Sequence, residues 1–518
     1  MKKKSIKPVV IHITHNPYAL LTTVRINGRP VAKRNALCGI PRHGHLQEWI
    51  DILPELLRKQ YPRRKYKFVF EGTKADFDDL VESLGTTINK KIRRADCRHV
   101  PAQEPQDKII QIHRLQAVLT DPSCPLPELA SPDVIAAFEH AKSDEFEVCV
   151  VATMSSGKST LINALLGNRL MPSRQDACTA IVTRIRDEDE LGESGFRGQA
   201  FDAQGKLVEE MPELTPEKMA ELNDKPSVTT LEVVGDIPFV ASEKLSLVLV
   251  DTPGPNNARN QCHRDVQRTF LNKSSKAVIL YVMTGQFGTE DDHALLDRIT
   301  RSMSVGGKQS RDRFIFVVNK MDCYKKEDGD PAETLQTIRS YLESHGIVNP
   351  SIFPVAALPA VNIRCELSGI ELDEDDADET AIAIRKLNRT PEMYLETYAR
   401  RFTSLPVTPI EELEAQRRAF AEAWQAKGGK PNEDPHEAVI HSGIPTLEAA
   451  IRVYIEKYAY PVKIRTIAQT LGHRLEEVEA EAVTTPLDAN GREFLDYIRC
   501  QLDELLEISP IKSASKQH

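Results

Sequence analysis

The chain has 518 residues, of which 41% are hydrophobic and 28% charged, and this much apolar material excludes a wholly disordered protein. Its longest apolar runs, 245–250 and 277–283, have the length of strands, and none approaches the roughly 18–20 residues that a transmembrane helix needs. The nine cysteines stand singly, which favours free thiols in a reducing cytoplasm over a disulfide framework or a zinc site.

Charge is distributed unevenly along the sequence. Residues 1–100 contain 21 Lys and Arg against 9 Asp and Glu, so they carry +12 and the rest of the chain carries −21. This asymmetry marks residues 1–100 as a separate unit and is compatible with an anionic partner, either a membrane surface or a nucleic acid. The plainer interpretation is a solvated face or a contact with the acidic remainder. The basic N-terminus has too short an apolar stretch for a signal peptide. The densest basic cluster is Lys90, Lys91, Arg93 and Arg94.

The first hundred residues are predicted to form a small α/β module. Strand-like and helix-like hydrophobic periods alternate there, and Pro54 should kink or split the helix in which it falls. A helical connector is expected over 101–145. In chain order we expect strands over 9–14 and 20–26, a helix over 45–60, a strand over 65–72, a helix over 76–88, and connector helices over 108–119 and 131–141.

A different pattern begins at residue 146. Apolar runs over 146–152, 245–251 and 314–320 resemble strands buried on both faces, with helical segments between them. This alternation predicts a mostly parallel sheet covered by helices. Further along we expect a hairpin over 196–210, a strand at 351, a solvated loop or helix start at 371–379, helices over most of 380–427 and a helix over 446–459. A helical pattern then continues to 506, with a break at 484–491. Its apolar stripe at 464–483 suits the core of a helical bundle.

Residues 148–167 carry the first motif with chemical meaning. A buried strand leads into a loop ending in Gly157, Lys158 and Ser159, and a helix follows. This matches the phosphate loop GxxxxGK[ST], except that Ala152 replaces the first glycine. Backbone N–H groups at such a helix N-terminus surround phosphates, while the lysine reaches the β- and γ-phosphates and the serine hydroxyl ligates Mg²⁺. Alone, the imperfect motif could be a chance match on an ordinary turn.

A second motif, DTPG, ends the strand over 245–251. Asp251 stands at the carboxyl end of that strand, where a second carboxylate on the Mg²⁺ side is needed. Gly254 lets its N–H approach a γ-phosphate without a Cβ clash.

A third motif, NKMD, follows the strand that begins at Phe314. Asp322 can accept hydrogen bonds from the N1–H and N2–H₂ groups of guanine, and the Lys320 stem can cover the base. Adenine lacks both donors, so this motif favours GTP over ATP. After one more strand, residues 354–357 occupy the place of a loop whose N–H groups meet the guanine O6. Three motifs in order, each at a strand end, argue against coincidence.

The motif set resembles a translation-factor-class GTPase and, within that class, the dynamin-like family. The phosphate loop ends in SSGKSTLINALLG, and DACTAIVTRI at 176–185 places Thr179 at the switch threonine that binds Mg²⁺. Asp251 lies 72 residues after Thr179, whereas small GTPases have a far shorter connection. Residues 441–451 resemble the last helix of a dynamin-like GTPase domain, which makes 366–436 an insertion.

The resemblance implies roles for individual residues. Thr179 and Gly254 would sense the γ-phosphate, and Ser155 matches a family position that holds a monovalent cation, K⁺ or Na⁺. Met154 departs from the Gln of eukaryotic dynamins, so nucleotide binding is better supported than fast hydrolysis. The predicted set comprises catalytic Lys158, Ser155, Thr179 and Gly254, nucleotide-binding Ser156, Gly157, Lys158, Ser159, Thr160, Asn319, Lys320 and Asp322, and Mg²⁺-binding Ser159, Thr179 and Asp251.

The resulting expectation is an α/β protein with a mostly parallel GTPase sheet, a flanking α-helical bundle and the small N-terminal module. Its domains would be 1–100, 101–145, 146–460 and 461–518. We expect a cytoplasmic dynamin-like GTPase, peripheral at a membrane if membrane is its partner, that hydrolyses GTP slowly and faster when GTPase domains self-associate. The alternative is a regulatory switch with little turnover that recruits a protein or nucleic acid through 1–100. Lone histidines, such as His113 and His441, are expected at the surface or in caps.

Overall fold

The computed structural model describes residues 8–62, 64–87, 96–132, 134–135, 138, 145–152, 155–172, 181–189, 195–240, 246–252, 277–288, 290–303, 307–324, 330–484 and 487–508. These divide into two compact units. The first comprises Met1–Asp144, Gly307–Gln309 and Tyr454–His518, and the second comprises Glu145–Gly306 and Ser310–Val453. The basic cluster at 90–94 lies outside the described residues. No helix in the described part of the chain is both long and apolar enough to cross a bilayer.

The first unit contains a five-stranded sheet in the order β3-β2-β1-β4-β5. Strand β1 pairs with β2 in antiparallel and with β4 in parallel orientation. Alternate residues of β1, including Ile11 and Ile13, are buried and pack with Phe68 and Phe70 of β4, as a sheet with one core face requires. The predicted α/β module is confirmed. Its elements are β1 Val9–Asn16, β2 Leu21–Ile26, β3 Arg29–Pro30, η1 Ala36–Gly39, η2 Leu46–Glu48, η3 Ile50–Ile52, α1 Leu53–Gln60, β4 Tyr66–Gly72, α2 Lys74–Thr87 and β5 Cys97–Pro101.

Pro54 divides the helix expected over 45–60. The 3₁₀ turns η2 and η3 precede α1, and Pro54 stands in the first turn of α1. A proline there removes an N–H that has no helical partner, and its fixed φ already suits the helix. The predicted split is confirmed, and the α-helix itself is only the second half of the expected segment.

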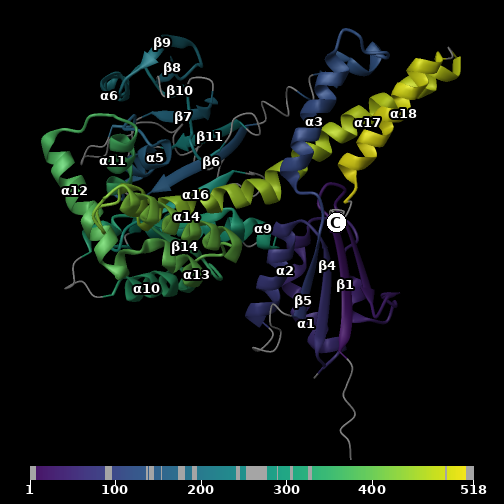
Figure 1. Cartoon of the computed structure of the whole chain (residues 1–518), viewed down its shortest axis with the longest axis horizontal. Helices are drawn as coiled ribbons and strands as arrows, with labels where there is room; N and C mark the ends of the chain where they lie inside the picture. The colour runs from purple at the N-terminus through teal and green to yellow at the C-terminus, as the bar shows by residue number, and fades with distance from the viewer. Residues whose placement is uncertain are drawn as a thin grey trace, which may run out of the picture. The chain divides into compact units, whose positions relative to one another are not determined.

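Helices α3, α17 and α18 pack side by side in the first unit (Figure 1). On α17, Ile464, Ile467, Leu471 and Leu475 recur at helical spacing and are at most 5% exposed. The apolar stripe of this helix is therefore bundle core, as predicted. The elements are α3 Pro105–Thr120, η5 Pro127–Ala130, the π-helical turn η11 Ile455–Ala459, α17 Tyr460–Thr484 and α18 Ala489–Leu506.

The second unit contains a nine-stranded sheet in the order β14-β13-β12-β6-β11-β7-β10-β8-β9. Figure 1 shows β7, β8, β9 and β10 together. Strands β6, β11, β12, β13 and β14 run parallel to one another, while β7 is antiparallel to β11 and β10 is parallel to β7. The expected mostly parallel sheet is confirmed, with an antiparallel extension at β8 and β9. The strands are β6 Glu145–Ala152, β7 Val182–Asp187, β8 Phe196–Phe201, β9 Leu207–Leu214, β10 Thr230–Gly235, β11 Ser246–Asp251, β12 Val278–Met283, β13 Phe314–Val318 and β14 Ser351–Pro354.

The acidic stretch at 371–379 is a helix start. The side chain of Asp373 accepts from Asp376 N at 2.8 Å, and three further acids lie in the first turn of α12, where negative charge suits the helix dipole. The helical and 3₁₀ elements of this unit are α5 Lys158–Leu166, α6 Pro216–Asp224, α8 Glu290–Met303, α9 Gly307–Asp312, η7 Met321–Cys323, α10 Pro331–Ser344, α11 Ala357–Leu367, α12 Glu374–Arg389, η9 Pro391–Met393, η10 Leu395–Tyr398, α13 Ala399–Phe402, α14 Val407–Ala426, α15 Pro435–His441 and α16 Ile444–Tyr454. The first half of α9 and the last residue of α16 belong to the first unit.

His441 is not the surface or capping residue expected from the sequence. It is fully buried, its Nδ1 lies 3.0 Å from Glu396 Oε1, and its ring stacks on Tyr394. Burial opposes protonation of the ring, but the bonds to Glu396 and Glu437 outweigh burial and raise the pKa of His441. It is a structural ion-pair residue that joins η10 to α15.

Replacing Leu471 by alanine should destabilise the helical bundle by about 2–5 kcal/mol, because the side chain is fully buried and its loss leaves a cavity. Urea denaturation, followed by hydrogen exchange in α17, measures the change. Gln469→Ala, at an exposed position of the same helix, is the matched control and should shift stability by less than about 0.5 kcal/mol. Equal effects of the two variants would contradict the bundle assignment.

Candidate nucleotide-binding site

The three sequence motifs meet at one edge of the larger sheet. Because β6, β11 and β13 are parallel members of one sheet, their carboxyl ends lie on the same side. Ala152 ends β6, Asp251 ends β11, and Asn319 follows β13 directly. Open α/β sheets bind ligands outside the carboxyl ends of their strands, so this edge is the candidate site.

The loop before α5 has the backbone conformation of a phosphate cradle. Ser155 has φ +58° and Gly157 has φ +86°, and α5 begins at Lys158. A Cβ at Gly157 would come within 2.4 Å of the Asn319 Nδ2 atom, so only glycine fits. Ser156 is buried, Ser155 is exposed, and Ser159 and Thr160 are half-buried in the first turn of α5, where orphan N–H groups and the helix dipole favour an anion.

Lys158 forms a buried ion pair at the bottom of this cradle. Its Nζ donates to Asp251 Oδ1 and to the carbonyl of Thr252, and the side chains of Lys158 and Asp251 are 10% and 0% exposed. The hydroxyl of Thr252 donates to the Val150 carbonyl at 2.8 Å, which fixes the chain after Asp251 to the neighbouring strand β6. The structure thus brings the predicted lysine and carboxylate into direct contact.

Asn319 connects the loops of the site. Its Nδ2 donates to the carbonyls of Ser156 and Gly157 at 3.1 and 3.4 Å, and its Oδ1 accepts from Ala357 N at 3.2 Å. The side chain is 3% exposed. One carboxamide therefore holds the phosphate loop beside the loop over 354–357 that the sequence assigned to the guanine O6.

Lys320 and Asp322 occupy the positions expected of base-binding residues. Lys320 has φ +63° and is exposed, and its Cε lies 3.8 Å from where a Cβ on Gly157 would stand. Its stem therefore passes over the phosphate loop. Asp322 is half-buried, and desolvation raises the pKa of its carboxyl, although Lys386 and Lys320 act in the opposite direction. A guanine that donates to this carboxylate would replace the lost hydration.

Thr179, Gly254 and Met154 lie outside the described residues. Thr183, the next threonine after Thr179, is opposite Asp251 in the β7–β11 pairing and is fully buried. Its hydroxyl has no hydrogen-bond partner within the described structure. The roles given to Thr179 and Gly254 stay predictions.

The residues present fit a Mg²⁺ ion bound together with phosphates. Mg²⁺ prefers a few carboxylate and hydroxyl oxygens combined with phosphate oxygens and water, and Ser159, next to Lys158 in the chain, and Asp251, in contact with Lys158, provide such oxygens. Because residue 157 is glycine, no Cβ enters the cradle, where one would clash with Asn319 Nδ2. The donor set contains no sulfur or imidazole ligand, so a softer metal is not favoured.

Two contacts of the site were not found from the sequence. Lys386 of α12, inside the segment 366–436, donates from Nζ to the carbonyl of Asp322 and, at 3.0 Å, to that of Tyr324. The carbonyl of Ser442 accepts from Ala356 N at 2.9 Å. Both join the base-binding loops to helices far along the chain, and no motif or spacing signals such long-range contacts.

Comparison with known proteins identifies a matching family. Residues 148–321 match the model of the dynamin family. An uncharacterized protein in the xynA 3′ region of Caldicellulosiruptor sp. (strain Rt8B.4) is 28% identical over 229 residues, 43% of this chain and 52% of that protein. A bacterial dynamin-like protein of Nostoc punctiforme is 22% identical over 263 residues, 46% of this chain and 36% of that protein. The alignments thus span about half or less of each relative.

One solved structure aligns with a TM-score of 0.39 and 16% identity, over 69% of this chain and 54% of that chain. It is described as an oligomerised bacterial dynamin pair that provides a mechanism for the long range sensing and tethering of membranes. The family match covers the phosphate-loop and DTPG motifs and the NKMD motif as far as Met321. The resemblance inferred from those motifs is confirmed.

Lys158→Ala should abolish detectable GDP and GTP binding in calorimetry, because it removes the only lysine charge of the phosphate loop. It should also destabilise the nucleotide-free protein by about 3–5 kcal/mol, since it leaves the buried Asp251 carboxylate without its cation. The double variant Lys158→Ala/Asp251→Asn is the matched control: it should recover most of the stability but none of the binding. Unchanged affinity in Lys158→Ala would remove the phosphate-loop assignment.

The affinity for GDP should fall as the pH is lowered, starting above the ordinary aspartate pKa of about 3.9. The carboxylate form of Asp322 accepts from guanine, this form dominates above the pKa, and burial has raised that pKa. Calorimetry from pH 8 to pH 5 measures the trend. In Asp322→Asn the affinity should already be low, and only the phosphate titration, common to both proteins, should remain. Parallel pH profiles would contradict the role of Asp322.

Proposed function

We propose that this dynamin-like chain, whose dynamin-family region is residues 148–321, binds GTP with Mg²⁺ and hydrolyses it slowly to GDP and phosphate. The observation that carries the proposal is the junction at Asn319, which holds the phosphate loop beside the base-binding loops. An ordinary turn with a chance GKS sequence would have no reason to be tied to the NKMD loop. The binding of a guanine nucleotide needs both loops in fixed positions.

In the proposed complex, the N–H groups of residues 155–160 surround the phosphates. Lys158 turns from Asp251 toward the β- and γ-phosphates, because a phosphate carries more charge than the carboxylate that now holds the lysine. Ser159, Thr179 and Asp251 would hold Mg²⁺, which supplies charge neutralisation for the phosphate oxygens when bound. Asp322 and Lys320 select guanine, as the NKMD motif predicts.

The chemical step is attack of water on the γ-phosphorus and rupture of the bond to the β–γ bridging oxygen. The proton of the attacking water passes to the phosphate that leaves as inorganic phosphate. Thr179 would orient the water through its carbonyl, and the N–H of Gly254 would bind the γ-phosphate. Met154 cannot accept a hydrogen bond from water as a glutamine carbonyl would, so we propose turnover well below the common enzyme value of about 10 s⁻¹.

Ser155 supports the proposal of a second positive charge in the transition state. It is exposed and has φ +58°, so its oxygen atoms are accessible to a K⁺ or Na⁺ ion beside the phosphates. Such a cation would offset the charge that develops on the bridging oxygen. Self-association of GTPase domains would shield this exposed position from water, and for this reason we propose stimulation by dimerisation.

Coupling to the helical bundle is proposed through the chain that joins the two units. Helix α16 continues through the π-helical turn Ile455–Ala459 into α17. π-Helical turns are rare and occur frequently at functional sites, because their extra residue weakens the local hydrogen-bond ladder. We propose that this turn is the hinge for nucleotide-dependent motion.

The same proposal includes three further parts. These are the domain limits 1–100, 101–145, 146–460 and 461–518, an anionic partner of the N-terminal module, and a peripheral membrane location.

Phosphate release at increasing protein concentration tests the proposal. Turnover per chain should rise with concentration, because dimers form; a flat, near-zero profile would instead support a regulatory switch acting through residues 1–100. Thr179→Ala should lower turnover at least tenfold and leave GDP affinity within about twofold, since GDP binding does not involve the switch. Thr183→Ala is the matched control. If Thr183→Ala abolishes turnover and Thr179→Ala does not, the switch assignment is wrong.

A further inference from the structure

A second cluster of functional side chains lies at the opposite edge of the larger sheet. Strand β7 is antiparallel to β11, and β10 is parallel to β7, so both strands end at the edge away from the candidate nucleotide site. Asp187 is the last residue of β7 and Asp236 directly follows β10. With Asp189, these residues place three carboxylates at one end of the sheet, and one oxygen of each lies within 4.8 Å of the other two.

Asp187 is the unusual member of this cluster. It is 4% exposed, and its Oδ1 accepts from Ile237 N at 2.8 Å. Its Oδ2 is buried and has no hydrogen-bond partner within the described structure. A buried carboxylate oxygen without a partner costs free energy unless a cation or a proton satisfies it.

The carboxyl of Asp187 lies beside two other negative charges. Burial, together with the charges of Asp189 and Asp236, raises the pKa of Asp187 to about 7, although the hydrogen bond from Ile237 N acts in the opposite direction. Within the described part of the chain, neither Asp187 nor Asp236 forms an ion pair. The neighbouring residue Glu188 forms an ion pair with Arg197 at 2.9 Å. Arg197 therefore compensates the charge of a residue outside the cluster.

We propose that Asp187, Asp189 and Asp236 bind a hard divalent cation of the size of Ca²⁺. Carboxylate oxygens are the ligands that such ions prefer, and Ca²⁺ at 2.3–2.6 Å accepts oxygens separated by up to roughly 4.6–5.2 Å across the ion. The three oxygens are therefore close enough for small side-chain rotations to bring them to one ion, and such an ion could satisfy the buried Oδ2 of Asp187.

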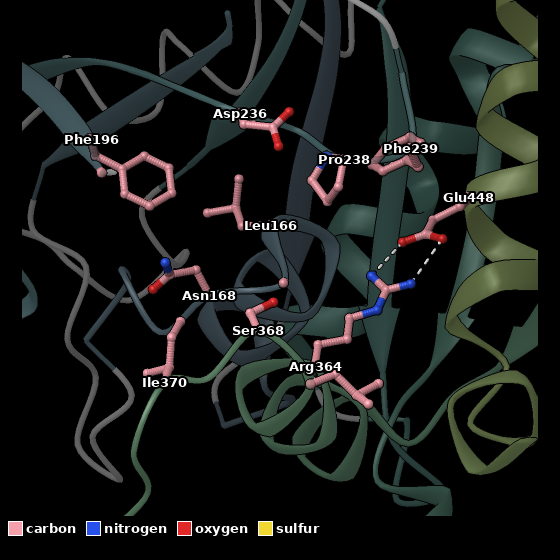
Figure 2. Close-up of a pocket in the computed structure, with 13 residues that line it drawn as sticks. Leu166, Asn168, Phe196, Asp236, Pro238, Phe239, Arg364, Ser368, Ile370 and Glu448 are labelled. Carbon is pink, nitrogen blue, oxygen red and sulfur yellow. Dashed lines mark hydrogen bonds and ion pairs between the residues drawn. The ribbon is translucent and has the colours of Figure 1, made fainter. Parts of the chain in front are cut away.

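A cavity adjoins the cluster at Asp236. Its volume is about 430 Å³, and Asp236 is part of its wall together with Phe196, Pro238, Arg364 and Glu448. Figure 2 shows Asp236 at one side of this cavity and the Arg364–Glu448 pair at the other. The guanidinium of Arg364 is bonded to both Glu448 oxygens, at 2.6 and 3.0 Å, so its charge is compensated and opposes cation entry only weakly.

The proposed ion would fasten the ends of two strands that belong to one ladder. β7 and β10 pair over Val182–Asp187 and Thr230–Gly235, and a cation held by Asp187 and Asp236 would close this ladder at its end. Because an ion that binds only the folded state stabilises it by mass action, the melting temperature should depend on the cation. This inference does not depend on the proposed GTPase function.

Calorimetric titration of the nucleotide-free full chain with CaCl₂ at pH 8, after removal of metals with EDTA, tests the proposal. We expect one Ca²⁺ site per chain and a rise of several degrees in melting temperature. Asp187→Asn should lose both, and Asp236→Asn should weaken binding at least tenfold. Glu188→Gln, in the same segment but paired with Arg197, should bind like the wild type.

Asp251→Asn distinguishes this site from the nucleotide site, because it removes the Mg²⁺ ligand at the other edge of the sheet and should leave the Ca²⁺ response unchanged. Absence of Ca²⁺ binding in the wild type would overturn the proposal. If Asp187→Asn then melts at a higher temperature than the wild type without Ca²⁺, a proton rather than a cation satisfies the Asp187 carboxylate. Equal binding by Asp187→Asn and the wild type would also overturn it. If Asp187→Asn fails to fold, Asp236→Asn and Glu188→Gln decide the question.

Discussion

One buried carboxamide fixes the geometry on which the candidate site depends. The Asn319 side chain donates to the phosphate-loop carbonyls of Ser156 and Gly157 and accepts from the N–H of Ala357. An asparagine offers both a donor and an acceptor on one planar group, so a single residue can join two loops that no strand connects directly. An aspartate there would lose the donor, and an apolar residue would remove this partner from the Ser156 carbonyl and the Ala357 N–H, whereas the Gly157 carbonyl also accepts from Leu161 N.

The parts of the fold that the sequence predicted are those set by local patterns. The apolar runs at 146–152, 245–251 and 314–320 became β6, β11 and β13 because strands buried on both faces need uninterrupted apolar residues. The phosphate-loop and NKMD residues were found because their spacing along the chain is fixed by the chemistry of the ligand. Pro54 was interpreted correctly because its effect on a helix is confined to one turn.

The features that the sequence did not predict depend on contacts between distant segments. Nothing near His441 indicates that Glu396 would be its partner, and nothing near Lys386 indicates that it would hold the carbonyl of Asp322. Both contacts involve residues of the helical segment 366–436, whose role next to the base-binding loop has no local signature. The antiparallel orientation of β7 is of the same kind, since a strand's direction in a sheet follows from the path of the chain.

The orientation of β7 has a mechanical consequence. The strand is hydrogen-bonded to β10 along one side and to β11 along the other, and its six residues span about 16–17 Å from Val182 to Asp187. A slip by one residue would turn its buried side chains to the wrong face, so the strand resists stretching and sliding and moves only as a stiff body. A tilt of β7 beside Thr183, which pairs with Asp251, would therefore also move the strand end at Asp187.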